Sequence, residues 1–222
     1  MLEKAKTQVE EILKNDKSGH GMEHINRVLS IAQTIAKTEE CDKEIVYLTA
    51  LLHDVDDYKL FGEDNQNNLT NTNKILTTIN IDSDRKEKII KNIKEIGFST
   101  RLKGIFPSSI EAKIVSDADM CDAIGAIGIV RTHQYCATHN QPFFDKKTFP
   151  TVQTAENYKK TGSLTAVCHF FEKILLLKDF MLTKKGKEIA NSRHEFMVQF
   201  LTQYFEEEQV PEWQEYLKKY LK

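Results

Sequence analysis

The sequence has few of the residues that would point to a specialised class of protein. It contains only 4 cysteines, 4 prolines and 9 glycines in 222 residues. The cysteines form no C-x-x-C pair, and their dispersion predicts reduced thiols rather than a disulfide framework. A chain of this length can bury roughly 70% or more of its unfolded surface, so it needs no cross-link or metal merely to fold.

Neither sign of charge dominates. The 31 Lys and Arg residues stand against 33 Asp and Glu residues, which gives a net charge of −2. Nucleic-acid-binding proteins carry a strongly basic face, and proteins of the membrane surface carry polybasic segments, so the composition argues against both partners. An enzyme or a protein–protein interaction module remains, because an even total charge can conceal a strongly charged pocket.

Long apolar runs are lacking as well. The first ten residues contain no apolar core of a signal peptide. The most apolar segment, residues 174–182, is interrupted by Lys178 and Asp179, whereas a membrane helix needs about 20 apolar residues. We therefore expect a cytoplasmic protein without a membrane-spanning segment.

What the chain does have is helical periodicity along nearly its whole length, and alternating strand patterns are almost lacking. Residues 98–109 are expected to be irregular, and Asp42 is the expected N-cap of the third helix. No repeat or linker interrupts the pattern, which predicts an all-α fold with a single domain over residues 1–222. The expected helices cover residues 2–15, 24–36, 43–55, 69–79, 85–96, 110–137, 154–180 and 183–208, followed by a short C-terminal helix.

An imidazole and a carboxylate lie side by side at the end of the third expected helix. His53 and Asp54 follow an apolar run, and this pair is costly to desolvate unless a positive charge compensates. A divalent cation would be one such compensator, and a hydrogen bond to water at the helix end is the alternative. His24 begins the second helix, and Arg27 follows one turn later on the same face.

Carboxylates also interrupt the apolar segment 115–122. Asp has poor helix propensity and is rarely buried without a partner. Asp119 and Asp122 share a helix face, and small residues make this helix thin enough for close packing. The segment therefore predicts a cation beside Asp119, whereas Asp117 receives a structural interpretation.

The order His24, His53–Asp54, Asp119 resembles that of the HD-domain metal-dependent phosphohydrolases, and the resemblance runs from about residue 18 to 205. It is similar to their small, single-domain bacterial branch. The stretches that carry it are residues 20–28, 50–59, 117–131, 169–178 and 193–197. The family resemblance implies a multi-helix HD-domain bundle with a central metal site. Its core motifs would span about residues 18–135, and C-terminal helices over 154–221 would pack on them.

The function implied by the resemblance is removal of a phosphate or pyrophosphate group from a small phosphorylated substrate by metal-activated water. The expected substrate is a nucleotide. No HD-GYP signature follows Asp54, which argues against the cyclic-di-GMP branch. We expect no attached regulatory domain, which argues against a large allosteric hydrolase. The alternatives are hydrolysis of a ppGpp-like alarmone and a catalytically silent metal-binding scaffold or sensor. Substrate identity, the group released and the choice between monomer and homodimer stay open at this stage.

The resemblance implies that His24, His53, Asp54 and Asp119 bind one ion. Two imidazoles and two carboxylates suit a divalent transition metal rather than Ca²⁺. Mn²⁺ is preferred, with Fe, Co, Ni, Zn or Mg as alternatives. Four protein ligands would leave positions for water and a phosphate oxygen.

Two further residues are expected to take part in catalysis. Arg27 is expected to clamp a phosphate through two parallel hydrogen bonds, and an ion pair with Glu23 is its alternative. Asp57, four residues after His53, is the expected general base or water-orienting group, with Asp56 as the alternative. Asp122 is expected to orient a ligand histidine.

The remaining expected substrate contacts are His20, Lys59, Lys103, His169 and Glu172. The first lies between two glycines and is expected at the edge of the cleft. The two lysines are candidate phosphate contacts, with solvent exposure as their alternative. The last two lie one helical turn apart, which fits pocket lining or helix packing.

Overall fold

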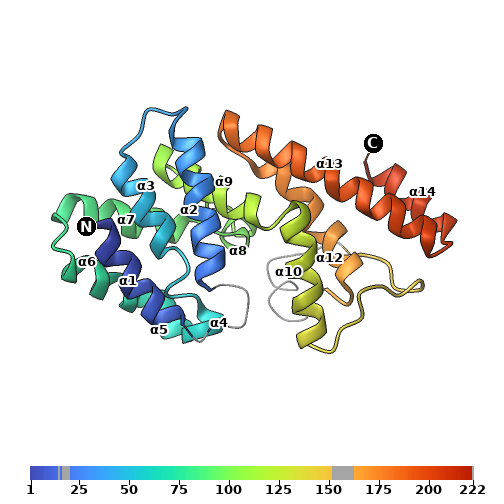
Figure 1. Cartoon of the computed structure of the whole chain (residues 1–222), viewed down its shortest axis with the longest axis horizontal. Coiled ribbons are helices and arrows are strands. Elements are labelled where there is room, and N and C mark those ends of the chain that lie inside the picture. Colours follow the sequence, from blue (N-terminus) through green and yellow to red (C-terminus); the bar gives the residue numbers. More distant parts are fainter. Residues whose placement is uncertain (15, 17–20, 152–162, 222) are drawn as a thin grey trace. The chain divides into compact units, whose positions relative to one another are not determined.

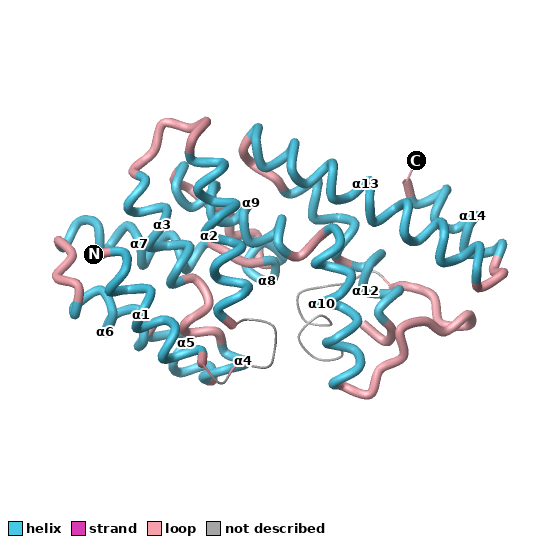
Figure 2. Tube along the Cα trace, viewed as in Figure 1, coloured by secondary structure: helices cyan, strands magenta, loops and turns pink. Residues whose placement is uncertain are grey.

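The computed structural model describes residues 1–14, 16, 21–151 and 163–221, with the backbone alone at Lys59. Within these ranges every regular element is a helix and none is a strand, which confirms the all-α prediction (Figure 2). The chain divides into two compact units. Unit 1 contains Met1–Asp122 and Met181–Gly186, and unit 2 contains Ala123–Phe180 and Lys187–Lys222. The single-domain assignment stays a prediction.

Unit 1 is a bundle in which three helices each pack against the other two: α2, α3 and α9. These are the helices that carry or adjoin the candidate metal ligands. In chain order the unit contains α1 (Leu2–Leu13), α2 (Met22–Ala36), α3 (Lys43–Leu52), α4 (Tyr58–Phe61), α5 (Glu63–Asn68), α6 (Thr70–Thr78), α7 (Ser83–Glu95), α8 (Phe98–Leu102) and α9 (Ile110–Asp122) (Figure 1).

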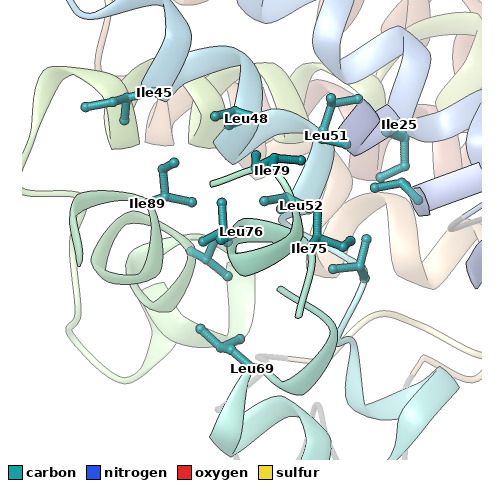
Figure 3. Packing of buried hydrophobic residues seen from close by; sticks show 14 of the residues in the cluster. Ile25, Ile45, Leu48, Leu51, Leu52, Leu69, Ile75, Leu76, Ile79 and Ile89 are labelled. Atoms are coloured by element: carbon teal, nitrogen blue, oxygen red, sulfur yellow. The ribbon is translucent and has the colours of Figure 1, made fainter. Parts of the chain in front are cut away.

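The core of unit 1 is aliphatic. Leu48, Leu51 and Leu52 of α3 are fully buried against side chains from α2, α6 and α7, among them Ile25, Leu76 and others labelled in Figure 3. Burial of each such side chain stabilises the fold by about 1.5–3 kcal/mol. This packing fixes α3 from its N-cap to its last turn and thereby sets where the chain leaves the helix.

The third helix begins as predicted and ends earlier. The Asp42 carboxylate accepts hydrogen bonds from the backbone N–H groups of Glu44 and Ile45, which confirms it as the N-cap. The helix ends at Leu52 rather than at residue 55, and residues 53–56 form turns. His53 is therefore the C-cap of α3, and Asp57 does not continue its helix.

The expected long helix over residues 110–137 is two helices. α9 ends at Asp122, and α10 (Gly125–Thr138) begins in unit 2 after two intervening residues. Gly125 has φ +80°, a left-handed conformation that favours glycine and ends the helical course. A Cβ on Gly128 would lie 2.3 Å from the carbonyl oxygen of Ala123, so the first turn of α10 needs glycine there. The glycines permit this break rather than a thin continuous helix.

Unit 2 also departs from the expected helix over residues 154–180. Residues 152–162 lie outside the described ranges, and α12 (Ala166–Glu172) begins at the capping hydroxyl of Thr165. A 3₁₀ helix, η1 (Ile174–Phe180), follows in place of a continued α-helix. The C-terminal helices α13 (Lys184–Glu207) and α14 (Pro211–Tyr220) agree with the prediction.

Aromatic side chains hold unit 2 together. Trp213 is fully buried, stacks on Phe149 with ring centroids 4.4 Å apart, and donates its indole N–H to the carbonyl oxygen of Lys146. Phe205 of α13 packs against the same indole. Aromatic burial of this kind anchors α13 and α14 to the loop before α12. None of the helices in the described ranges is long and apolar enough to cross a membrane.

Candidate metal centre

His24 lies in the first turn of α2, and its side chain is 2% exposed. Its Nδ1 is 2.7 Å from Oδ2 of Asp122, and its Nε2 is 3.3 Å from Nε2 of His53. A carboxylate accepts a hydrogen bond, so Nδ1 of the neutral ring carries the proton. The lone pair of the neutral ring is then on Nε2, directed at the second histidine.

His53 is oriented in the same way by the backbone. Its Nδ1 lies 2.9 Å from the carbonyl oxygen of Ala50, one turn earlier in α3. A carbonyl oxygen only accepts, so Nδ1 donates and Nε2 carries the lone pair when the ring is neutral. The side chain of His53 is 2% exposed, which keeps competing water away from both nitrogens.

Two carboxylates complete the cluster. Oδ2 of Asp54 lies 3.3 Å from Nε2 of His24 and 3.6 Å from Nε2 of His53. Oδ1 of Asp119, from the last turn of α9, lies 3.6 and 3.7 Å from the same two nitrogens. The ligand atoms of His24, His53 and Asp119 all lie within 4.8 Å of one another.

The chemistry of these donors fits a divalent transition metal. The two imidazole nitrogens lie 3.3 Å apart, and each lies 3.3–3.7 Å from one oxygen of Asp54 and one of Asp119. Asp54 is not part of the group whose ligand atoms all lie within 4.8 Å of one another. Four acceptors at this distance repel unless protons or a metal ion lie between them. Ligand atoms bound at about 2.1 Å to one ion lie about 3.0–3.4 Å apart, close to the observed spacing.

The pKa values of these groups reflect the same crowding. Burial alone would lower the pKa of His53, but Asp54 and Asp119 outweigh it and raise this pKa to about 9. Burial also opposes the charged form of His24, yet hydrogen bonds with Asp122 and Asp54 raise its pKa above 6.5. Burial would raise the pKa of Asp119, whereas both histidines hold it below its usual value.

Arg27 pairs with the carboxylate of Asp122 rather than with that of Glu23, the alternative partner considered for it. Its Nε donates to Oδ1 of Asp122 over 2.6 Å, and its Nη2 donates to Oδ2 over 3.1 Å. Asp122 is 1% exposed and accepts from His24 as well, so it bridges the guanidinium and the ligand histidine. In the described ranges Nη1 of Arg27 has no hydrogen-bond partner, and the side chain is 32% exposed. The role of Arg27 as a phosphate clamp stays a prediction. Because Nε and Nη2 bind Asp122, Nη1 is the nitrogen that remains for a phosphate.

The neighbouring aspartates after the His–Asp pair differ in what they bind. Asp56 is 3% exposed, and its carboxylate accepts from the backbone N–H groups of Asn71 and Thr72 at the start of α6. Asp57 is partly exposed and directly precedes α4, with its carbonyl oxygen accepting from the backbone N–H of Leu60. Asp56 is thus committed to the fold, which leaves Asp57 as the stronger candidate for proton transfer.

The other expected substrate contacts are less informative. Lys103 is exposed at the C-cap of α8. Lys59 lies in α4, but its side chain is outside the description, and His20 lies outside the described residues altogether. These three roles stay predictions.

His169 and Glu172 lie in α12 of unit 2. The buried Glu172 carboxylate accepts from the backbone N–H of Thr151 over 2.8 Å and from the hydroxyl of Ser163. The same hydroxyl lies 3.1 Å from Nδ1 of His169. These contacts hold Thr151 and Ser163 against α12. A substrate role for His169 or Glu172 stays a prediction.

Sequence reasoning missed Asn71 and the partners of Asp117. Asn71 donates to the carbonyl oxygen of Val55 within the turn that follows His53. Its only sequence signal is a polar Asn and Thr run before an apolar stretch, which is typical of a helix start. Asp117 accepts from the backbone N–H groups of Leu182 and Thr183 and has the structural role that the sequence suggested.

A donor set of this order, at the ends of three mutually packed helices, is typical of an HD-domain hydrolase. The chain belongs to the HD-domain superfamily of hydrolases, whose family description, "HD domain", matches residues 21–124. It is similar to YpgQ of Bacillus subtilis (strain 168), with 33% identity over 202 residues that make up 90% of each chain. Residues 21–124, which the family description matches, contain all four candidate ligands.

Solved structures agree over nearly the whole chain. A protein from Lactobacillus plantarum is 32% identical with a TM-score of 0.83 and aligns over 94% of this chain and 97% of its own. An HD-superfamily hydrolase from Bacillus thuringiensis is 32% identical with a TM-score of 0.72 over the same shares. Bacillus subtilis YpgQ in complex with ADP is 30% identical with a TM-score of 0.71 over 93% and 97%.

Proposed function

We propose that the chain is a divalent-metal-dependent phosphohydrolase that acts on a nucleotide, with Mn²⁺ as the preferred ion held by His24, His53, Asp54 and Asp119. The observation that carries the proposal is the convergence of four acceptor atoms whose histidines are both fixed with Nε2 inward. The nucleotide is suggested by the ADP complex of the relative YpgQ.

In this proposal the metal, Asp57 and Arg27 have separate roles. When bound, the metal supplies a Lewis acid and lowers the pKa of water at the site. Asp57, partly exposed beside the turn that holds His53 and Asp54, accepts a proton from the attacking water. Nη1 of Arg27 donates to a phosphate oxygen, while Nε and Nη2 keep the guanidinium in place against Asp122.

The test is turnover by protein stripped with EDTA and reloaded with single divalent ions. Nucleoside mono-, di- and triphosphates, sugar phosphates and a ppGpp-like alarmone are incubated with it, and phosphate and pyrophosphate are measured separately. We expect Mn²⁺-dependent release from nucleotides, lost in His53→Asn. The matched control is His139→Asn, which changes an exposed histidine at the C-cap of α10.

Each other outcome has a definite meaning. Metal binding without turnover of any substrate would contradict the proposal and favour a scaffold or sensor. Turnover that survives both EDTA and His53→Asn would remove the cluster from the reaction. Release of pyrophosphate from the alarmone alone would replace the nucleotide substrate by the alarmone.

A further inference from the structure

The turn between α3 and α4 carries three residues of the proposed site, His53, Asp54 and Asp57, on irregular backbone. Within it, Val55 N–H donates to the carbonyl oxygen of Leu52 over 3.4 Å, and Asp57 N–H donates to that of Asp54 over 3.1 Å. A site built on such a segment needs support from neighbouring elements to hold its side chains in place.

The start of α6 provides that support through one asparagine. The side-chain amide of Asn71 donates to the carbonyl oxygen of Val55 over 2.7 Å. Its backbone N–H donates to Oδ1 of Asp56 over 2.8 Å. Asn71 therefore binds two consecutive residues of the turn, one with its side chain and one with its main chain.

Asp56 completes the connection from the side of the turn. Its Oδ2 accepts from Thr72 N–H over 2.9 Å, and its Oδ1 also accepts from the side-chain amide of Asn65 over 2.6 Å. The first N–H groups of a helix have no partner within the helix, so this carboxylate satisfies the N-terminus of α6. The turn and the helix start thus hold each other.

The entry into α6 is itself fixed by the core. Leu69 has φ +49° and ψ +50°, a left-handed conformation that a leucine rarely adopts, and it immediately precedes the helix. Its side chain is 4% exposed and packs in the aliphatic cluster with Ile75 and Leu76 (Figure 3). Non-glycine residues in this conformation persist where the surroundings over-determine them. The position of Asn71 is thereby coupled to the core of unit 1.

We propose that Asn71, together with Asp56, is a positioning residue that fixes the turn carrying His53, Asp54 and Asp57. This inference rests on the proposed function, because it assigns the turn to the metal site. The hydrogen bonds of Asn71 to this turn reach Val55 and Asp56 rather than the candidate ligands His53 and Asp54. It acts through the backbone of Val55 and the carboxylate of Asp56.

The test compares Asn71→Ala with Asn73→Ala. Asn73 lies in the same helix, is also partly buried, and its amide donates to the carbonyl oxygens of Asn68 and Leu69, both over 3.0 Å. Both variants lose amide–carbonyl bonds at the start of α6, but Asn71→Ala alone releases the turn. Mn²⁺ affinity is measured by titration calorimetry, and hydrogen exchange of residues 53–57 is measured in metal-free protein.

We expect Asn71→Ala to weaken Mn²⁺ binding by about tenfold or more, the usual effect of losing a partner that orients the ligands. Asn73→Ala should stay within about twofold of the parent chain. Exchange of the amides of Val55 and Asp57 should accelerate in Asn71→Ala only. If Asn71→Ala fails to fold, Asn71→Ser keeps the backbone bond to Asp56 and a residue suited to a helix start, while its hydroxyl is too short to reach Val55.

Equal Mn²⁺ affinity and equal exchange in the two asparagine variants would overturn the inference while leaving the phosphohydrolase proposal intact. A parent chain that binds Mn²⁺ but hydrolyses no phosphorylated substrate would overturn the proposed function, and the comparison of affinity and exchange would still decide the role of Asn71. A parent chain that binds no divalent ion would contradict both.

Discussion

Asp122 holds His24 by a hydrogen bond of 2.7 Å between Oδ2 and Nδ1, across 98 residues of sequence. The same carboxylate pairs with Arg27 through both of its oxygens. A ligand histidine is thus oriented by a carboxylate that is itself neutralised by a guanidinium. This arrangement sets the tautomer of His24 and supports the inward direction of its Nε2.

Asp122→Asn should weaken Mn²⁺ binding by about 10–100-fold, because the amide holds His24 less strongly and leaves Arg27 unneutralised. Titration calorimetry on the EDTA-stripped protein measures this. Asp145→Asn, which changes a carboxylate in unit 2, is the control and should leave affinity unchanged. Equal affinities in the two variants would show that Asp122 does not orient the ligand.

Arg27→Lys should raise the KM for a nucleotide by about tenfold and weaken Mn²⁺ binding less than Asp122→Asn does. A lysine retains the charge beside Asp122, but it cannot donate two parallel hydrogen bonds and still present a third nitrogen to phosphate. Steady-state kinetics at saturating Mn²⁺ separates the two effects. An unchanged KM combined with a large loss of metal affinity would limit Arg27 to supporting Asp122.

Asp57→Asn should lower kcat by about 10²–10⁴-fold, the usual contribution of a general base, without altering Mn²⁺ affinity. The control is Asp84→Asn, an exposed carboxylate in the first turn of α7. The measurement is initial rate against pH at saturating metal. A parent-like kcat in Asp57→Asn would exclude it as the base.

The metal-free protein should lose stability as pH rises. Asp54 and Asp119 raise the pKa of His53 to about 9 from an unfolded value of 6.5, despite its burial. The stabilisation is fully present below pH 6.5 and is lost as pH rises to about 9, with a size of about 3 kcal/mol. Urea unfolding in EDTA across this range measures it, and Asp119→Asn should flatten the trend. A free energy of unfolding that rises between pH 6.5 and 9 would contradict the direction.

Gly186→Ala should destabilise unit 1 by about 1–3 kcal/mol through overpacking. A Cβ at this position would lie 2.3 Å from Oδ2 of Asp117 and 2.7 Å from Oγ1 of Thr183, where both atoms form a tight network. Urea unfolding gives the difference. Gly21→Ala is the control, because its nearest neighbour would be the Asp16 side chain at 3.2 Å and its φ is −73°.

Local signals in the sequence located most of the helices and all four candidate ligands. Asp42 showed the start of α3 because an N-cap works through its immediate neighbours. α3 ends three residues earlier than its periodicity predicts, and the turn that follows it binds Asn71, 16 residues beyond Val55, a contact that local periodicity cannot show. Glycines at 125 and 128 were interpreted as packing sites, since glycine permits a thin helix and a helix break equally well.

The partners within the candidate site show the same limit. Residue type and order indicated which histidines and aspartates would gather, because few other roles suit them in apolar segments. The alternative to a phosphate clamp was an ion pair of Arg27 with Glu23, four residues away, whereas the carboxylate that it binds is that of Asp122, 95 residues away. Only the packing of α2 against α9 brings these two side chains together. Tertiary packing therefore determines that the Arg27 guanidinium binds the distant carboxylate of Asp122.

The backbone donors to Asp117 lie 65 and 66 residues later in the chain. Asp117 is fully buried, and burial raises its pKa even though Leu182 and Thr183 supply backbone donors to it. Those donors belong to Met181–Gly186, the segment of unit 1 that follows residues 123–180 of unit 2 in the sequence. A nascent chain that has emerged only as far as Asp122 already contains all four candidate metal ligands, but it lacks the N–H groups of Leu182 and Thr183 that donate to Asp117. These hydrogen bonds of unit 1 can therefore form only after residues 123–180 of unit 2 have been synthesised.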